Sequence, residues 1–252
     1  MKIVVTVKQV PDPNSTLSLE TDNTISREKE VVLDPGDECG IEEGLQLKEA
    51  HGGEVILVSM GPERARDALR KGLSMGADRA VLVTDAALSG ADALTTAKVL
   101  AAAIKQEEPD LVICGTESYD GSTGMVPPML AELLGFPQLT FAKKIEVEGS
   151  TIKIHRQTAD GYQVVEAATP ALVSVTGAIA EPRYASLKGI MAARSKEIKQ
   201  VAVGDLRVEM GESAETIEGV SDAESRKAGE VIQDDGTAVD RIVQVLAAAK
   251  VL

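Results

Sequence analysis

The chain has 252 residues, of which 44% are hydrophobic and 26% charged. This balance predicts one or two globular domains with a sizeable core, and it excludes disordered and fibrous proteins. Forty acidic against 26 basic side chains give a net charge of −14. That charge repels nucleic-acid backbones and anionic lipids, and no apolar run is long enough to span a bilayer. We therefore expect neither nucleic-acid binding nor membrane insertion.

Cysteines and histidines are scarce. Cys39 and Cys114 lie far apart without a CxxC spacing, which indicates neither a disulfide framework nor a zinc site. A reducing, cytoplasmic location is therefore expected. His51 and His155 are the two histidines, so metal binding and histidine-based catalysis have little support.

Four short apolar runs rich in β-branched residues predict buried strands: 3–7, 55–59, 80–84 and 111–114. Between them, apolar residues recur at helical spacing: Ile41, Leu45 and Leu47; Ala65, Ala68, Leu69 and Leu73; and Leu94, Ala97, Leu100, Ala101 and Ile104. Alternating strands and helices predict a parallel sheet covered on both faces. We expect a doubly wound α/β unit over the first 135 residues.

Two segments depart from this alternation. The connection 9–33 is long, and Leu17, Leu19 and Ile25 flank a Thr-Asp-Asn sequence that is typical of a hairpin turn. From 138 to 176 the period changes to two, which predicts a small antiparallel extension. The apolar run at 172–175 then adds to that sheet or to its edge.

Beyond residue 200 the chain holds eleven acids and five bases, and it has little core of its own. Thr237 followed by Asp240 predicts a capping box at the start of a helix. Val239, Ile242, Val243 and Leu246 form one apolar stripe on that helix. We expect this arm to pack on a partner protein.

A candidate ligand site lies at the carboxyl ends of the predicted strands, where open α/β sheets bind ligands. Thr6, Met60 and a glycine-rich turn at 115–124 converge there. The amides of this turn, at the start of a helix, suit a phosphate, although a capped turn without a ligand is the alternative.

The sequence holds no standard phosphate-binding fingerprint after a strand. Five charged residues near these strand ends are the only acid–base candidates: Lys8, Asp34, Asp37, Glu117 and Asp120. Carboxylates on loops are more often caps or solvated groups, so we assign no catalytic residue.

A second candidate site covers 181–196. Five bases and one acid lie between Arg183 and Lys199, with Leu187, Ile190 and Met191 among them. Apolar side chains set among bases suit docking on another protein. The alternative is a surface helix that packs its apolar face on its own domain.

The chain resembles the β subunits of electron transfer flavoproteins over nearly its whole length. The resemblance rests on four segments: Val-Lys-Gln-Val-Pro-Asp at 7–12, Leu-Ser-Met-Gly-Ala-Asp-Arg at 73–79, Asp-Leu-Val at 110–112, and Glu-Pro-Arg-Tyr at 181–184 with Gly-Ile-Met at 189–191. It implies an adenine-nucleotide-binding fold with a flavodoxin-like strand order. It also implies a heterodimer in which the α subunit holds the redox FAD and the β subunit a buried AMP.

Residue by residue, the resemblance implies AMP contacts at Thr6, Asp34, Pro35, Gly36, Asp37, Met60, Gly115, Thr116, Glu117, Ser118, Asp120, Gly121, Ser122, Thr123, Gly124, Met125 and Val126. Asp34-Pro35-Gly36 stands where many members have Asn-Pro-Phe, and Gly124-Met125-Val126 where they have Asn-Gln-Thr or Ala-Gln-Val. These departures leave open the bifurcating branch, whose β subunit carries a second FAD.

The resemblance makes Leu187 the anchor of a recognition loop, 183–199, that docks partner dehydrogenases. Arg183, Tyr184, Ile190 and Met191 share this docking role. The expected domains are 1–199, with the nucleotide site and the loop, and 200–252, an arm that packs on the α subunit.

The leading hypothesis is an electron-carrier subunit rather than a complete enzyme. Acyl-CoA-type dehydrogenases would reduce the α-subunit FAD, which passes electrons to a quinone reductase. An adenine-nucleotide-sensing module and an enzyme acting on the nucleotide are the alternatives.

Overall fold

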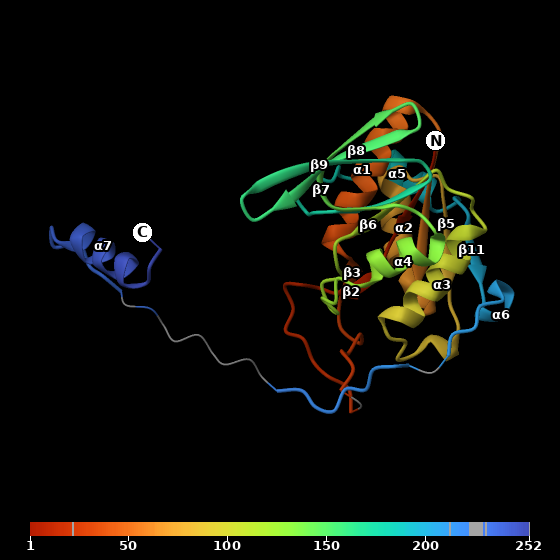
Figure 1. Cartoon of the computed structure of the whole chain (residues 1–252). Helices are drawn as coiled ribbons and strands as arrows, with labels where there is room; N and C mark the ends of the chain where they lie inside the picture. Colours follow the sequence, from red (N-terminus) through yellow and green to blue (C-terminus); the bar gives the residue numbers. More distant parts are fainter. Residues whose placement is uncertain (22, 212, 222–228, 230, 252) are drawn as a thin grey trace. The chain divides into compact units, whose positions relative to one another are not determined.

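The computed structural model describes residues 1–21, 23–211, 213–221, 229 and 231–251. Internal contacts divide the chain into two units, Met1–Ile217 and Glu218–Leu252 (Figure 1). Each unit is described by itself below.

A nine-stranded sheet forms the centre of the first unit. Its strands, in spatial order, are β11 (Ile198–Val201), β5 (Arg79–Val83), β4 (Glu54–Met60), β1 (Lys2–Thr6), β6 (Leu111–Gly115), β10 (Ala171–Val175), β7 (Gln138–Glu148), β8 (Thr151–Thr158) and β9 (Gly161–Ala168). Neighbours from β11 to β7 pair in parallel, whereas β8 and β9 continue the sheet in antiparallel fashion. The predicted α/β class, with a parallel sheet and an antiparallel extension, is confirmed.

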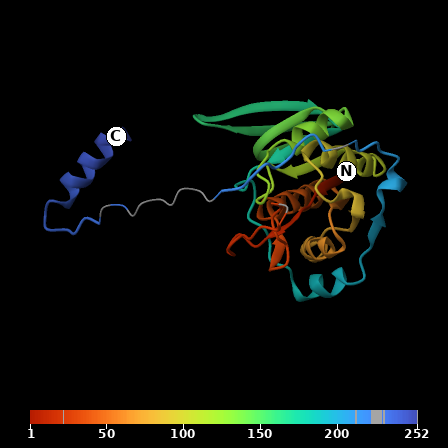
Figure 2. The same cartoon turned by 90° about the horizontal axis from the view of Figure 1, so that it is seen from below.

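Helices cover both faces of the parallel part, as Figure 2 shows. The helices of the first unit are α1 (Pro35–His51), α2 (Arg66–Met75), α3 (Ala93–Lys105), α4 (Val126–Leu134), α5 (Leu187–Ala193) and α6 (Val203–Leu206), with single 3-10 turns η1 (Glu63–Ala65) and η2 (Ala86–Leu88). Helices α1 and α2 pack with Ile3 and Val5, while α3 and α4 pack with Val4. This period of two in β1 puts fully buried side chains on both faces, which is the doubly wound arrangement.

Three details differ from the expectations. The strand order around the centre is β5-β4-β1-β6, which matches the 3-2-1-4 part of the classic dinucleotide-binding sheet and not the flavodoxin-like order. Strand β10 is an interior parallel strand between β6 and β7, not part of the antiparallel extension or an edge. Leu94 is 39% exposed, because the first turn of α3 projects it away from the sheet.

The long connection after β1 contains the predicted hairpin. Strand β2 (Gln9–Pro11) pairs antiparallel with β3 (Val31–Leu33), and Leu19 bridges Ile25 farther out. The turn residue Asp22 lies outside the described residues.

The second unit contains α7 (Ala238–Ala248). Its predicted apolar stripe is exposed within the unit, with Val239 at 72% and Val243 at 49%. The predicted capping box does not form, because the Thr237 hydroxyl donates to Asp235 Oδ1 at 2.6 Å and does not cap the helix. In the part of the chain that the structure describes, no helix is long and apolar enough to cross a membrane.

Candidate functional site

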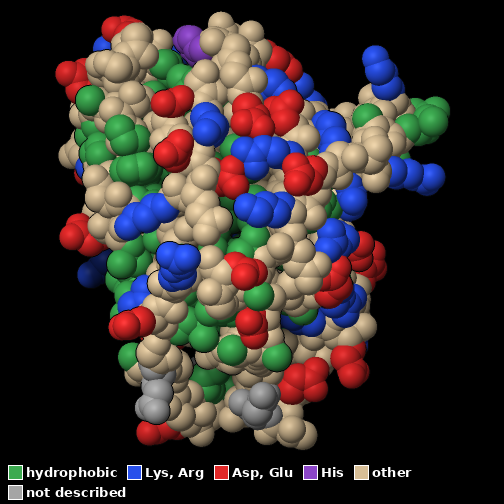
Figure 3. Space-filling view, turned by 90° about the vertical axis from the view of Figure 1, so that its right-hand side faces the viewer, with side chains coloured by type: hydrophobic (Ala, Val, Ile, Leu, Met, Phe, Trp, Pro, Cys, Tyr) green, Lys and Arg blue, Asp and Glu red, His purple; other side chains and the backbone are tan. Residues whose placement is uncertain are grey.

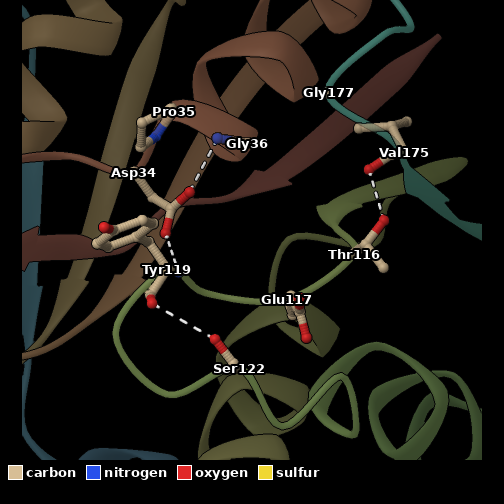
Figure 4. Close-up of a pocket in the computed structure, with 9 residues that line it drawn as sticks. All are labelled: Asp34, Pro35, Gly36, Thr116, Glu117, Tyr119, Ser122, Val175 and Gly177. Atoms are coloured by element: carbon tan, nitrogen blue, oxygen red, sulfur yellow. Dashed lines mark hydrogen bonds between the residues drawn. The ribbon is translucent and has the colours of Figure 1, made fainter. Parts of the chain in front are cut away.

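A pocket of about 440 Å³ opens at the carboxyl ends of β6 and β10, beside the start of α1 (Figure 4). Its lining consists of Asp34, Pro35, Gly36, Thr116, Glu117, Tyr119, Ser122, Val175 and Gly177. This volume lies in the range of about 300–1,000 Å³ that is usual for small-molecule sites.

Asp34 joins two walls of the pocket. It is the N-cap of α1, where its Oδ1 accepts from the Gly36 amide at 2.8 Å. Its Oδ2 accepts from the Tyr119 amide at 2.7 Å, so the same carboxylate also holds the glycine-rich turn (Figure 4). The Gly36 amide and the positive end of the α1 dipole thus already have an anionic partner in Asp34, which disfavours a ligand phosphate there.

The glycine-rich turn forms the opposite wall. Thr116 Oγ1 donates to the Val175 carbonyl at 2.9 Å, which ties the turn to β10. Ser122 and Gly124 both adopt left-handed backbone conformations, with φ of 46° and 62°. These conformations turn the chain sharply before α4 begins.

The start of α4 offers fewer amides than the sequence suggested. Pro127 and Pro128 occupy its first turn and carry no N–H, so the helix itself is a poor phosphate site. The amides of Thr123 and Gly124, in contrast, have no hydrogen-bond partner among the described residues. Phosphate binding at this turn would therefore rest on the loop amides rather than on α4.

A buried ion cluster holds the outer side of the turn. Asp120, whose side chain is 3% exposed, pairs with Lys8 Nζ at 2.6 Å and with the Arg27 guanidinium. Burial alone would raise the pKa of Asp120, but Lys8 and Arg27 hold it below its usual value. Lys8 Nζ also donates to Ser118 Oγ at 3.1 Å. This cluster links the turn to β1 and to the long connection that contains Arg27.

Beneath the pocket lies a second buried carboxylate. Asp37 Oδ2 accepts from the Lys8 amide at 2.7 Å. Burial, followed by the neighbouring charge of Asp34, raises the pKa of Asp37 well above its ordinary value. A Cβ on Gly115 would lie 2.9 Å from Asp37 Oδ1, so a side chain there would displace the Asp37 carboxylate. Asp37 and Gly115 therefore position the wall of the pocket and do not line it.

The structure brings together part of the predicted nucleotide site. Six predicted residues line the pocket: Asp34, Pro35, Gly36, Thr116, Glu117 and Ser122. The other predicted positions do not line the pocket. They lie at the ends of β1, β4 and β6, in the first turn of α1, along the glycine-rich turn and at the start of α4: Thr6, Asp37, Met60, Gly115, Ser118, Asp120, Gly121, Thr123, Gly124, Met125 and Val126. Sequence reasoning missed three lining residues. Tyr119 lies within the predicted turn but was not among the predicted contacts, and a parallel assignment of β10 would have placed Val175 and Gly177 at the same edge of the sheet.

The predicted docking residues form a separate surface around α5. Tyr184 is 95% exposed, Leu187 75% and Met191 65%, whereas Ala193 is buried against the domain. Arg183 anchors the start of this segment, because its guanidinium bonds Glu42 at 2.7 Å as well as Glu49 of α1. The side chains of Tyr184, Leu187 and Met191 are therefore mostly in solvent, whereas Ile190 is about half exposed.

These features define a doubly wound α/β protein with a ligand pocket at its strand ends and an exposed apolar segment flanked by bases. The model of the electron transfer flavoprotein domain matches residues 22–206. Electron transfer flavoprotein β subunits of Mycobacterium leprae and Mycobacterium tuberculosis are 44% and 41% identical, over 99% of each chain. The β subunit of Megasphaera elsdenii is 35% identical over the full length of both.

The chain belongs to the electron transfer flavoprotein family, as a β subunit. Membership implies flavin-linked electron transport in assembly with an α subunit.

Replacing Asp120 with Asn tests the ion cluster. Because Lys8 and Arg27 are partly exposed and screened, we expect a loss of about 1–2 kcal/mol in the free energy of unfolding at pH 7. The folded-state pKa is depressed, so this stabilisation is present above the ordinary Asp pKa and is lost as the pH falls through the folded-state value. Urea unfolding of the heterodimer at pH 7 and at low pH measures the difference.

The matched control is Asp160→Asn, the same change in the exposed turn between β8 and β9. It should leave stability unchanged at both pH values. A deficit for Asp120→Asn that stays constant with pH would contradict the role given to the carboxylate.

Proposed function

We propose that the chain is an AMP-binding, donor-docking subunit of an electron carrier. In this proposal acyl-CoA-type dehydrogenases dock on the α5 surface, and electrons pass onward to a quinone reductase. The FAD of the α subunit supplies the redox chemistry. This chain contributes the nucleotide pocket, the docking surface and the terminal arm, and it needs no catalytic side chain of its own.

The pocket is the observation that carries the nucleotide assignment. It lies at the carboxyl edge of a parallel sheet, next to the Thr123 and Gly124 amides, which have no hydrogen-bond partner in the described part of the chain. These two neutral donors suit one phosphate, while Glu117 and Ser122 supply acceptors and a hydroxyl for the nucleoside.

The charges around the pocket favour a ligand with a single phosphate. Lys8 and Arg27, the cations near the turn, are engaged by Asp120. Asp34 and Glu117 add negative charge to the lining. FAD carries a second phosphate and a much larger second half, so a pocket of about 440 Å³ with this lining supports AMP over a second FAD.

The deciding experiment is the nucleotide content of the native heterodimer. After purification with its α subunit and denaturation, the complex should release one FAD and one AMP, identified by mass. Two FAD and no AMP would overturn the AMP assignment and favour a bifurcating carrier.

Glycine variants test the pocket within the same assay. Gly124→Val places a β-branched residue at a φ of 62° in the turn. We expect the free energy of AMP binding to weaken by about 1–3 kcal/mol, so that less AMP is retained. Gly149→Val is the control, since it imposes the same strain at a φ of 61° in the turn between β7 and β8, away from the pocket. Equal AMP retention in the two variants would mean that the turn is only structural.

The terminal arm is proposed to bind the α subunit through the apolar stripe of α7. Val239, Ile242, Val243 and Leu246 are exposed within their own unit, and burying them on a partner is favourable. Deleting 237–252, or changing Val243 to Asp, should weaken the heterodimer at least about tenfold. Analytical ultracentrifugation of the purified complex measures this.

The control for the arm is Gln244→Asp, which adds the same charge at a neighbouring polar position of α7. It should leave the affinity for the α subunit unchanged. Unaltered assembly of the truncated chain would show that the stripe does not bind there.

Leu187 is proposed as the docking anchor. Its side chain is 75% exposed at the first residue of α5, and one well-filled pocket often dominates an interface. Leu187→Ala should raise the half-saturating carrier concentration about tenfold to a hundredfold in electron transfer from a reduced acyl-CoA dehydrogenase. Flavin absorbance reports the transfer.

Leu94→Ala is the control for this variant, because it truncates another exposed leucine, on α3. Folding and nucleotide content should stay unchanged in both variants. A half-saturating concentration that does not move for Leu187→Ala would refute the anchor assignment.

A further inference from the structure

A groove of about 460 Å³ runs between α2 and α5, beside the exposed docking residues. Six residues line it: Arg70, Lys71, Ser74, Ile190, Ala193 and Arg194. Three of the six are basic and none is acidic, in a chain with a net charge of −14. Half of this lining comes from α2, which lies more than 100 residues before the docking segment.

The two walls of the groove are held together closely. A Cβ on Gly189 would lie 2.4 Å from the Ser74 carbonyl oxygen, so α5 contacts α2 at a distance that only glycine allows. Arg70 Nη1 donates to the carbonyls of Ala193 and, at 2.8 Å, Lys196. Lys196 Nζ in turn donates to the Leu73 carbonyl at 3.1 Å and to the Ala77 carbonyl. The groove is therefore a preformed feature and not a gap between loose segments.

The basic residues around the groove fall into two groups: those that hold the two helices together and those that have weak or no ion pairs. Carbonyls at helix carboxyl ends carry partial negative charge, and Arg70 and Lys196 offset it here. The Lys71 side chain is 47% exposed and forms an ion pair with Glu38 at the long distance of 3.9 Å. The Arg194 guanidinium has no ion-pair partner among the described residues. Lys71 and Arg194 are thus available to bind an acidic group of another molecule.

Other bases of the protein are mostly used internally. On the face shown in Figure 3, many Lys and Arg side chains (blue) lie next to Asp and Glu side chains (red). Arg79, for example, pairs with Glu54 at 2.7 Å and with Glu107 at 2.6 Å. The groove instead combines one base that has no ion-pair partner among the described residues with one weakly paired base, and its lining contains no acid.

We propose that the α2–α5 groove binds a carboxylate side chain of the donor dehydrogenase, next to the place where Leu187 docks. The proposal rests on the donor-docking function proposed above and assigns a second contact to it. Ile190 forms an apolar wall of the groove, so the acceptor is an acidic side chain adjoining apolar residues. Arg194 can bind a carboxylate with both guanidinium nitrogens, while Lys71 adds a point charge.

The test uses the purified heterodimer and a reduced acyl-CoA dehydrogenase from the same cell. The double variant Lys71→Glu/Arg194→Glu should raise the half-saturating carrier concentration at least tenfold at low salt. The neutral variant Lys71→Gln/Arg194→Gln should show a smaller rise and a weaker dependence on ionic strength than the wild type. Lys105→Glu, at the end of α3 on the opposite face of the sheet, is the control and should behave as wild type.

Each outcome decides between the proposals. If Leu187→Ala weakens docking but the charge variants do not, the groove assignment is wrong and the docking function stands. If the charge variants weaken the heterodimer itself, the occupant is the α subunit and the groove proposal is overturned. If the wild-type complex accepts no electrons from the dehydrogenase, both the docking function and the groove proposal fall.

Discussion

The position of β1 in the sheet determines where this protein can bind a ligand. β1 pairs in parallel with β4 on one side and with β6 on the other. The crossover from β1 to β4 passes through α1 and the crossover to β6 passes through α3, on opposite faces of the sheet. A crevice opens at the carboxyl end of such a switch point. The start of α1 and the turn after β6 border this crevice, and β10 closes its far side because it pairs with β6.

Carboxylates, not cations, organise this site. Asp34 bonds amides of both α1 and the turn, Asp37 accepts from the Lys8 amide, and Asp120 gathers two cations. The three carboxylates are themselves buried, and these bonds satisfy acceptors that would otherwise destabilise the fold. These three acidic residues therefore stabilise the walls of the site. The Thr123 and Gly124 amides, which have no partner among the described residues, are the donors suited to an anionic ligand.

The docking surface combines a rigid base with exposed apolar side chains. Arg183 fastens one end of the segment to α1, while Arg70 and Lys196 fasten the other end to α2. Leu187 and Met191 project from this base into solvent. A preformed surface loses less conformational entropy when a partner binds, which suits a carrier that must dock and release repeatedly.

Local pattern determined the elements: the runs at 3–7, 55–59, 80–84 and 111–114 became strands, since an apolar, β-branched run between helical periods is stable only as a buried parallel strand. The glycine-rich turn and the exposed docking segment were also visible from the sequence. Tertiary structure alone decided the strand order, the interior place of β10 and the contribution of Val175 and Gly177 to the pocket. It alone decided that Lys71 and Arg194 line the same groove, one from α2 and one at the end of α5. These features depend on contacts between residues far apart in the chain, which no local period encodes.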